Sequence, residues 1–186
     1  LRGIPHFAVS IACEYKGKIE HAVVLDPIRR EEFVASRGRG AQLNGRRIRV
    51  SQLSSLDNAL IGTGIPFRAR QSEHMAAYVK SLEKLASGCA GIRRAGAAAL
   101  DLAYVAAGRV DGTWGIRTNL WDIAAGLIEM RLQLARALQH DLDIPVELRQ
   151  RLTDRAGLLA HPRTFSTARI VFSVAMQVVG ETVQTR

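Results

Sequence analysis

Hydrophobic and polar positions make the first fifty residues a region of strands. Residues 7–14 and 18–25 alternate or run apolar, and the short Gly-bearing connection Tyr15-Lys16-Gly17 joins them, which predicts a β-hairpin. A third strand is expected over residues 32–36, and glycine and Asn-Gly turns after it mark two further short strands. The first part of the chain therefore predicts an antiparallel meander.

The apolar period changes after residue 51. A strand over residues 60–64 is followed by an apolar stripe at helical spacing over residues 72–87. A short strand at 92–94, a helix over 97–107, a second short strand and a helix capped by Asn119 follow. This order is βαβα, in which loops at strand ends build sites, so we expect the α/β class.

The helix expected over residues 97–107 is apolar on nearly every side, which is typical of a helix buried on all faces. Gly108 is placed to end it. The small residues Gly96, Ala97 and Ala98 at its start let backbone come close to a ligand or to a neighbouring segment. Close helix packing and a ligand wall are both consistent with this pattern.

Composition favours a cytoplasmic protein with one core, or one domain and a small appendage. The chain has 186 residues, of which 47% are hydrophobic, and no window approaches the roughly 18 apolar residues that cross a bilayer. The two cysteines, Cys13 and Cys89, are isolated, which favours a reducing compartment. The five histidines form no metal-binding pair, so they predict no metal site.

The formal net charge of +9 raises the question of an anionic partner. The basic residues are mostly arginines scattered along the chain, with no run of five or more, which argues against a dedicated nucleic-acid surface. Arg93 and Arg94 stand at the end of a predicted strand, where neighbouring side chains point to opposite faces. At most one of them would face a phosphate or a subunit interface.

One motif carries a resemblance to a known family. Trp121-Asp122-Ile123-Ala124-Ala125-Gly126 is similar to the W-D-x-A-A-G box of the inositol monophosphatase family. Residues 91–110, the Leu43-Asn44-Gly45-Arg46 turn and residues 3–12 resemble bacterial members in the same order. The resemblance covers about residues 3–128.

The resemblance implies a fold, a reaction and several site residues. The fold would be an incomplete form of the layered α/β/α/β/α sandwich, and the reaction Mg²⁺-dependent hydrolysis of inositol monophosphate. By this resemblance Asp122 would bind Mg²⁺, and Gly96, Ala97 and Ala98 would form a wall facing the substrate. Family members are usually dimers, which implies a homodimer and an interface role for Arg93 or Arg94.

Two departures from the family pattern bear on activity. The family commonly has a glutamate seven residues before the W-D aspartate, and Gly115 stands at that position here. Asp26-Pro27 is followed by Ile28-Arg29-Arg30 and not by the metal-binding continuation of D-P-x-D-G-T, so we expect an ordinary turn there. Of the family's ligands, only Asp122 is matched. The alternative to an enzyme is a catalytically silent family member that acts at most as a binding or dimerising module.

The resemblance ends near Ile128, and we expect a domain over residues 1–130 and an unassigned tail over 131–186. The tail has helical patterns and one apolar run, residues 168–179, that suits a strand. Without covering helices, apolar strand residues such as Phe7, Val9 and Ile11 would face water, which predicts a marginal chain that tends to associate. Whether the chain is a fragment, frame-shifted or truncated stays open at this point.

Overall fold

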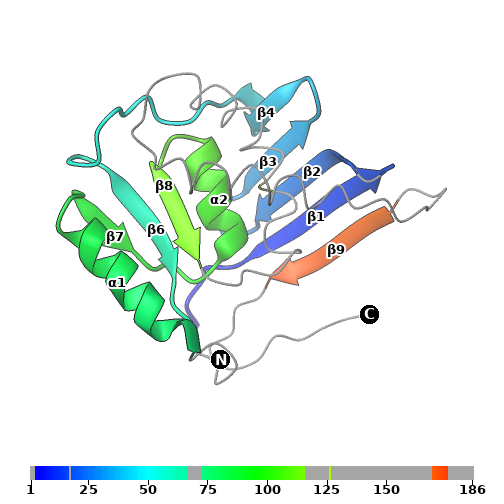
Figure 1. The fold of residues 1–186 in the computed structure, drawn as a ribbon. Coiled ribbons are helices and arrows are strands. Elements are labelled where there is room, and N and C mark those ends of the chain that lie inside the picture. Colours follow the sequence, from blue (N-terminus) through cyan, green and yellow to red (C-terminus); the bar gives the residue numbers. More distant parts are fainter. Residues whose placement is uncertain (1–2, 17, 67–72, 116–125, 127–168, 176–186) are drawn as a thin grey trace.

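The computed structural model describes residues 3–16, 18–66, 73–115, 126 and 169–175. In these ranges the chain forms a six-stranded sheet and a three-stranded sheet with helices packed against them (Figure 1). No helix in the same ranges is long and apolar enough to cross a membrane.

The larger sheet is the predicted antiparallel meander, extended by one strand. Its strands in chain order are β1 (Ala8–Tyr15), β2 (Lys18–Asp26), β3 (Glu31–Ser36), β4 (Gly40–Leu43), β5 (Arg46–Arg47) and β9 (Arg169–Ala175), in the spatial order β5-β4-β3-β2-β1-β9. Asn44 and Gly45 take φ values of 48° and 76° between β4 and β5, the left-handed pair that a two-residue hairpin turn requires. Asp26 accepts hydrogen bonds from the backbone N–H of Ile28 and Arg29, both at 3.0 Å, which confirms the turn expected at Asp26-Pro27.

Small side chains face the core from this sheet. Ala8, Ala12 and Ala22 are at most 3% exposed, and they lie on the side of the sheet that meets a helix. Val9 and Ile11 point to the opposite side and are half-buried, so they are less exposed than the sequence led us to expect. Alanines on the inner face let a helix backbone approach the strands closely.

β9 pairs antiparallel with β1, from Ala8 opposite Ala175 to Glu14 opposite Arg169. The strand lies within the apolar run 168–179, for which the sequence indicated a strand. A segment far along the chain thus forms one edge of the sheet. The domain boundary near residue 130 stays a prediction.

The smaller sheet is parallel and has the predicted βαβα order. Its elements in chain order are β6 (Leu60–Gly64), α1 (Met75–Ala86), β7 (Gly91–Arg93), α2 (Ala98–Ala106) and β8 (Gly112–Gly115), with β6 central in the order β7-β6-β8. The main-chain N–H of Leu60 donates to the Asp111 carboxylate at 2.7 Å, and that of Asp111 donates to the Leu60 carbonyl at 2.9 Å. This reciprocal contact fixes the start of β8 beside β6.

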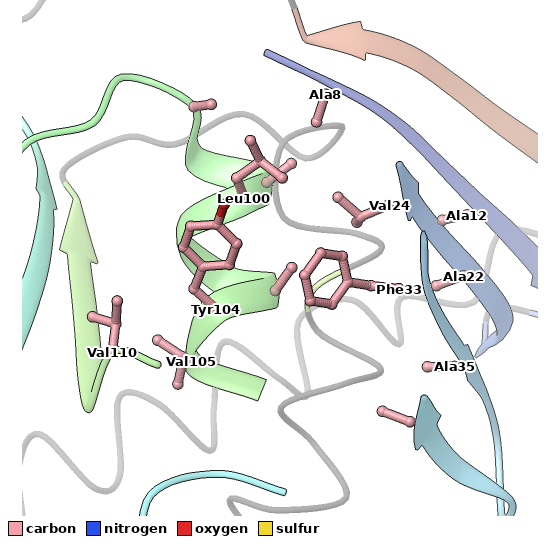
Figure 2. Packing of buried hydrophobic residues seen from close by; sticks show 14 residues of the cluster. Ala8, Ala12, Ala22, Val24, Phe33, Ala35, Leu100, Tyr104, Val105 and Val110 are labelled. Atoms are coloured by element: carbon pink, nitrogen blue, oxygen red, sulfur yellow. The ribbon is translucent and has the colours of Figure 1, made fainter. Parts of the chain in front are cut away.

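α2 lies between the two sheets, and α1 lies on the outer side of the smaller one (Figure 1). Leu100 and Tyr104 of α2 belong to one buried cluster with Val24 and Phe33 of the large sheet, and Val105 lies beside Val110 (Figure 2). The Phe33 and Tyr104 rings lie 6.0 Å apart between centroids. The described part is therefore an α/β fold of four layers: the large sheet, α2, the small sheet and α1. This agrees with the incomplete layered α/β sandwich that the sequence predicted.

Candidate functional site at the start of α2

The loop that enters α2 is held in one backbone path. Gly96 has a φ of 97°, which favours glycine, and Ala97 is extended with φ −134° and ψ 93° before the helix begins at Ala98. Ala97 is 1% exposed and belongs to the core cluster, whereas Gly96 and Ala98 are half-buried. Of the three predicted wall residues, Ala97 turns its side chain inward and offers only backbone to the outside.

The first turn of α2 has backbone N–H groups for which the residue before the helix, Ala97, offers no side-chain acceptor. Ala97 occupies the capping position and makes no side-chain hydrogen bond to them, because alanine has no polar side chain. Free N–H groups and the positive end of the helix dipole favour an anion at such a place. The geometry therefore suits a polar or anionic group lying against the Gly96–Ala98 backbone.

Arg93 and Arg94 follow β7 and precede this loop. Arg93 is half-buried, and its guanidinium carbon lies 5.9 Å from the centroid of the Tyr104 ring, in cation–π range. Arg94 is exposed. The two arginines thus differ in burial, and Arg93 is engaged inside the molecule, against α2.

Asp101 is a buried carboxyl that the sequence analysis did not single out. It lies in the first turn of α2, is 5% exposed, and burial raises its pKa to about 6, an effect that the positive charges of Arg93 and Arg94 oppose. The sequence contained one signal for this buried carboxyl: Asp101 is the one acidic residue in a predicted helix that is otherwise apolar on nearly every side. A carboxyl with such a pKa changes charge just below neutral pH.

Asp101 is packed against the centre of the parallel sheet. A Cβ added to Gly62 on β6 would lie 3.7 Å from the Asp101 carboxyl carbon and 3.1 Å from Thr113 Oγ1 on β8. The missing side chain at Gly62 therefore makes room for the Asp101 carboxyl and the Thr113 hydroxyl. These two polar groups lie between α2, which forms the candidate site, and the parallel sheet.

The other end of α2 is tied to the large sheet by a charged contact. Arg109 donates from both terminal nitrogens to the two carboxylate oxygens of Glu31 on β3, at 2.7 and 2.6 Å. The hydrogen bonds from Arg109 lower the pKa of Glu31. The same guanidinium lies over the rings of Tyr104 and Phe33, at 5.2 and 5.9 Å from their centroids. This contact links the segment that follows α2 to β3.

Asp122, the predicted metal ligand, lies outside the described residues. Gly126, the last residue of the same motif, is described and buried against α2. A Cβ at Gly126 would lie 2.6 Å from Leu102 Cβ, closer than real Cβ contacts, so only glycine fits there without movement. The end of the W-D-x-A-A-G motif is thus placed beside α2. Gly115, where the family has a glutamate, is exposed at the end of β8.

The described residues do not group the ligands that a Mg²⁺ ion requires. Within these ranges no cluster of three or more His, Cys, Asp or Glu side chains could hold a metal. Mg²⁺ prefers several oxygen ligands in near-octahedral geometry, and the buried carboxyls Asp26 and Asp101 do not supply such a set. Asp26 instead binds Arg29, with Nη1 and Oδ2 2.9 Å apart.

Comparison with known proteins agrees with this arrangement. The model of the inositol monophosphatase family matches residues 1–128. The Nus factor SuhB of Pseudomonas aeruginosa is 62% identical over 128 residues, 69% of this chain and 47% of the relative. The inositol-1-monophosphatase of Rhizobium meliloti is 50% identical over 131 residues, 70% of this chain and 48% of the relative.

Solved structures share the fold over the same part of the chain. The extragenic suppressor protein suhB from Bartonella henselae aligns with a TM-score of 0.66 and 48% identity, over 69% of this chain and 48% of that one. This chain spans about half the length of the curated relatives that it matches. The matched segment holds both the meander and the βαβα unit with its Gly96–Ala98 loop, and on these grounds the chain belongs to the inositol monophosphatase family.

Proposed function

We propose that this chain supplies the substrate-facing wall of a Mg²⁺-dependent phosphatase that acts on inositol monophosphate. The observation that carries the proposal is the loop Gly96–Ala98, which presents backbone and uncapped N–H groups at the start of a helix fixed between two sheets. A relative named inositol-1-monophosphatase shares half of its residues with this chain over the matched part. Inositol phosphate is accordingly the proposed ligand.

The role that we assign to these residues is binding and orientation. The N–H groups of the first turn of α2 donate toward a polar group of the substrate, and the small side chain at Ala98 leaves room for it. A substrate held in one orientation loses less entropy on the way to the transition state. Asp122 is the proposed metal ligand of this chain, and because the described carboxyls form no ligand cluster, we assign no catalytic step to them.

The second candidate function is a catalytically silent binding or dimerising module. Gly115 has no carboxylate to offer a sugar hydroxyl, and the described residues hold no ligand cluster. Several relatives carry the name Nus factor SuhB and not the name of an enzyme. Both candidate functions include a homodimer with exposed Arg94 near its interface. Both also include a cytoplasmic location. The free thiols of Cys13 and Cys89 support a reducing compartment.

Nuclear magnetic resonance titration with inositol 1-phosphate tests the binding role. We expect the amide signals of Gly96, Ala97 and Ala98 to shift in a saturable way, and Ala98→Glu to weaken the binding at least tenfold by adding bulk and negative charge. Ala76→Glu is the matched control, because Ala76 is an exposed alanine in the first turn of α1. Shifts confined to other residues, or equal effects of the two variants, would refute the substrate wall.

Phosphate release tests catalysis by the 186-residue chain separately. A single carboxylate holds Mg²⁺ poorly, so we expect Mg²⁺ binding no tighter than about millimolar and no Mg²⁺-dependent release of phosphate above the uncatalysed rate. Calorimetry and a colorimetric phosphate assay measure the two. Mg²⁺-dependent release that disappears in Asp122→Asn would make this chain an enzyme and exclude the silent module.

A further inference from the structure

Four arginines gather at one edge of the large sheet, far from the start of α2 in the fold. Arg39 lies in the turn between β3 and β4, Arg46 and Arg47 form β5, and Arg49 follows it. All four are exposed. We call this set the arginine edge. In the sequence seven other residues separate these four arginines, and the β4–β5 hairpin brings them together.

The hairpin fixes where two of the four side chains point, those of Arg46 and Arg47. Arg46 is opposite Leu43 and Arg47 opposite Gln42, so the two neighbours extend to opposite sides of the edge. Arg47 Nη2 donates to the backbone carbonyl of Arg39 at 3.3 Å, which holds the Arg47 side chain along the turn. A Cβ at Gly40 would lie 3.8 Å from Arg47 Nε, which places the Arg47 side chain beside the start of β4.

The positive charge of the arginine edge is not neutralised within the described part of the chain. Three other arginines there have a carboxylate partner: Arg29 has Asp26, Arg37 has Glu20 and Arg109 has Glu31, at 2.9, 3.0 and 2.6 Å. No carboxylate in the same ranges lies within ion-pair distance of the four edge arginines. Glu32 on β3 is an exposed acid near these arginines: its backbone N–H donates to Asn44 Oδ1, and its carbonyl accepts from the backbone N–H of Asn44.

Protection of a sheet edge explains part of this pattern but not all of it. Charged residues on an edge strand prevent pairing with another chain, and Arg46 and Arg47 serve that purpose. Arg39 and Arg49 lie outside β5, so the charge extends from the turn before β4 to the segment that follows β5. A guanidinium group binds a phosphate through two parallel hydrogen bonds, so several exposed arginines on one edge suit a chain of phosphates.

We propose that the arginine edge binds the phosphate backbone of a single-stranded nucleic acid. An open hollow lined by Leu43, Asn44, Arg46 and Ile48 lies beside it, and the guanidinium plane of Arg46 is the group there on which an unstacked base of a single strand would stack. The edge offers a flat two-residue strand and no helix or projecting ribbon, so it has nothing to enter the major groove of a duplex. This inference is independent of the proposed phosphatase function.

Fluorescence anisotropy with a labelled 20-nucleotide single-stranded RNA of mixed sequence, titrated with the 186-residue chain, tests the inference. The edge variant combines Arg39→Gln, Arg46→Gln, Arg47→Gln and Arg49→Gln. The control variant removes the same charge elsewhere and combines Lys16→Gln, Lys18→Gln, Lys80→Gln and Lys84→Gln, all at exposed positions. Circular dichroism establishes that each variant keeps the fold, and an all-lysine edge variant keeps the charge without the planar groups.

We expect the edge variant to bind the RNA at least tenfold more weakly and the control variant to change affinity less than twofold. Log affinity falls with log salt, and each lost phosphate contact makes this fall less steep by about 0.7. The slope of the edge variant should therefore be about 2 to 3 smaller in magnitude than that of the wild type. The all-lysine edge should bind between the wild type and the glutamine variant. Equal loss in both glutamine variants, tighter binding of duplex than of single strand, or equal binding of polyglutamate would overturn the proposal.

Discussion

The two helices in the described part of the chain are close in length and opposite in environment. α1 has 12 residues, of which Tyr78 alone is buried, whereas every residue of α2 from Ala99 to Ala106 is buried. α1 rests on one sheet and shows its other side to solvent, with Val79 50% exposed. α2 is enclosed by a sheet on each side, so it has no solvent face on which polar residues could stand.

This difference explains which helix positions the candidate site. Ala99, Ala103 and Ala106 are fully buried, and their small side chains let both sheets approach the helix. A helix packed on two sides cannot shift without disturbing both sheets, so the loop before it is fixed as well. α1 is anchored by the stacked pair Tyr78–Trp114, 5.6 Å between ring centroids, and by a hydrogen bond from Thr63 to the Tyr78 hydroxyl.

The largest effect should come from truncating a leucine in each helix. Leu100 on α2 is fully buried, so Leu100→Ala should cost about 3 kcal/mol of the free energy of unfolding through lost burial and a cavity. Leu82 on α1 is half-buried, and Leu82→Ala should cost about 1 kcal/mol. Urea denaturation of both variants measures the contrast. Equal losses would mean that α1 is as integral to the core as α2.

A second contrast concerns the residue that ends α2. Gly108 has a φ of 68°, and a Cβ there would lie 2.9 Å from the Arg49 carbonyl oxygen, so Gly108→Ala adds a backbone clash to the strain of a left-handed alanine. Gly38 has a φ of 76° with nothing within 4 Å of a Cβ. We expect Gly38→Ala to cost about 1 kcal/mol and Gly108→Ala about 2 to 3 kcal/mol in thermal unfolding. A cost for Gly108→Ala no larger than that for Gly38→Ala would place the α2 terminus farther from residues 49–51.

Much of the fold could be predicted from the sequence because the patterns are local. The meander and the βαβα order follow from alternation and from glycine and Asx turns, and strands β1, β2 and β3 lie within a residue of the expected ranges. The all-round apolar pattern of residues 97–107 correctly predicted a buried helix. The W-D-x-A-A-G motif identified the family because its residue types and order are specific.

The features that the sequence did not predict are those that depend on contacts between residues far apart in the chain. The inward orientation of Ala97 and the burial of Asp101 depend on which sheets enclose α2, and periodicity does not specify that. The arginine edge exists because a hairpin joins residues that are separate in sequence. The pairing of β9 with β1 spans most of the chain, and no local pattern selects β1 as its neighbour.

The buried carboxyl of α2 should make stability depend on pH in a definite direction. The pKa of Asp101 is raised from 3.8 to about 6, so between these values the folded chain binds more protons than the unfolded chain. Stability from this group is present below about pH 4 and is lost as pH rises through about 6, by about 3 kcal/mol. Asp101→Asn should remove that loss, and the exposed Asp57→Asn, measured by the same denaturation series, should not. An unchanged pH profile in Asp101→Asn would assign the dependence to other groups.

Hydrogen exchange tests the central claim most directly, that the core of this chain is α2 and the two sheets that enclose it. The account predicts that the amides of residues 101–107 exchange only through global unfolding, at least about 100-fold more slowly than those of α1. The amides of β9, at a sheet edge, should also exchange faster than those of α2. If α1 were as protected as α2, the claim would be contradicted, and if residues 145–179 were as protected as residues 91–126, the domain boundary near residue 130 would be wrong.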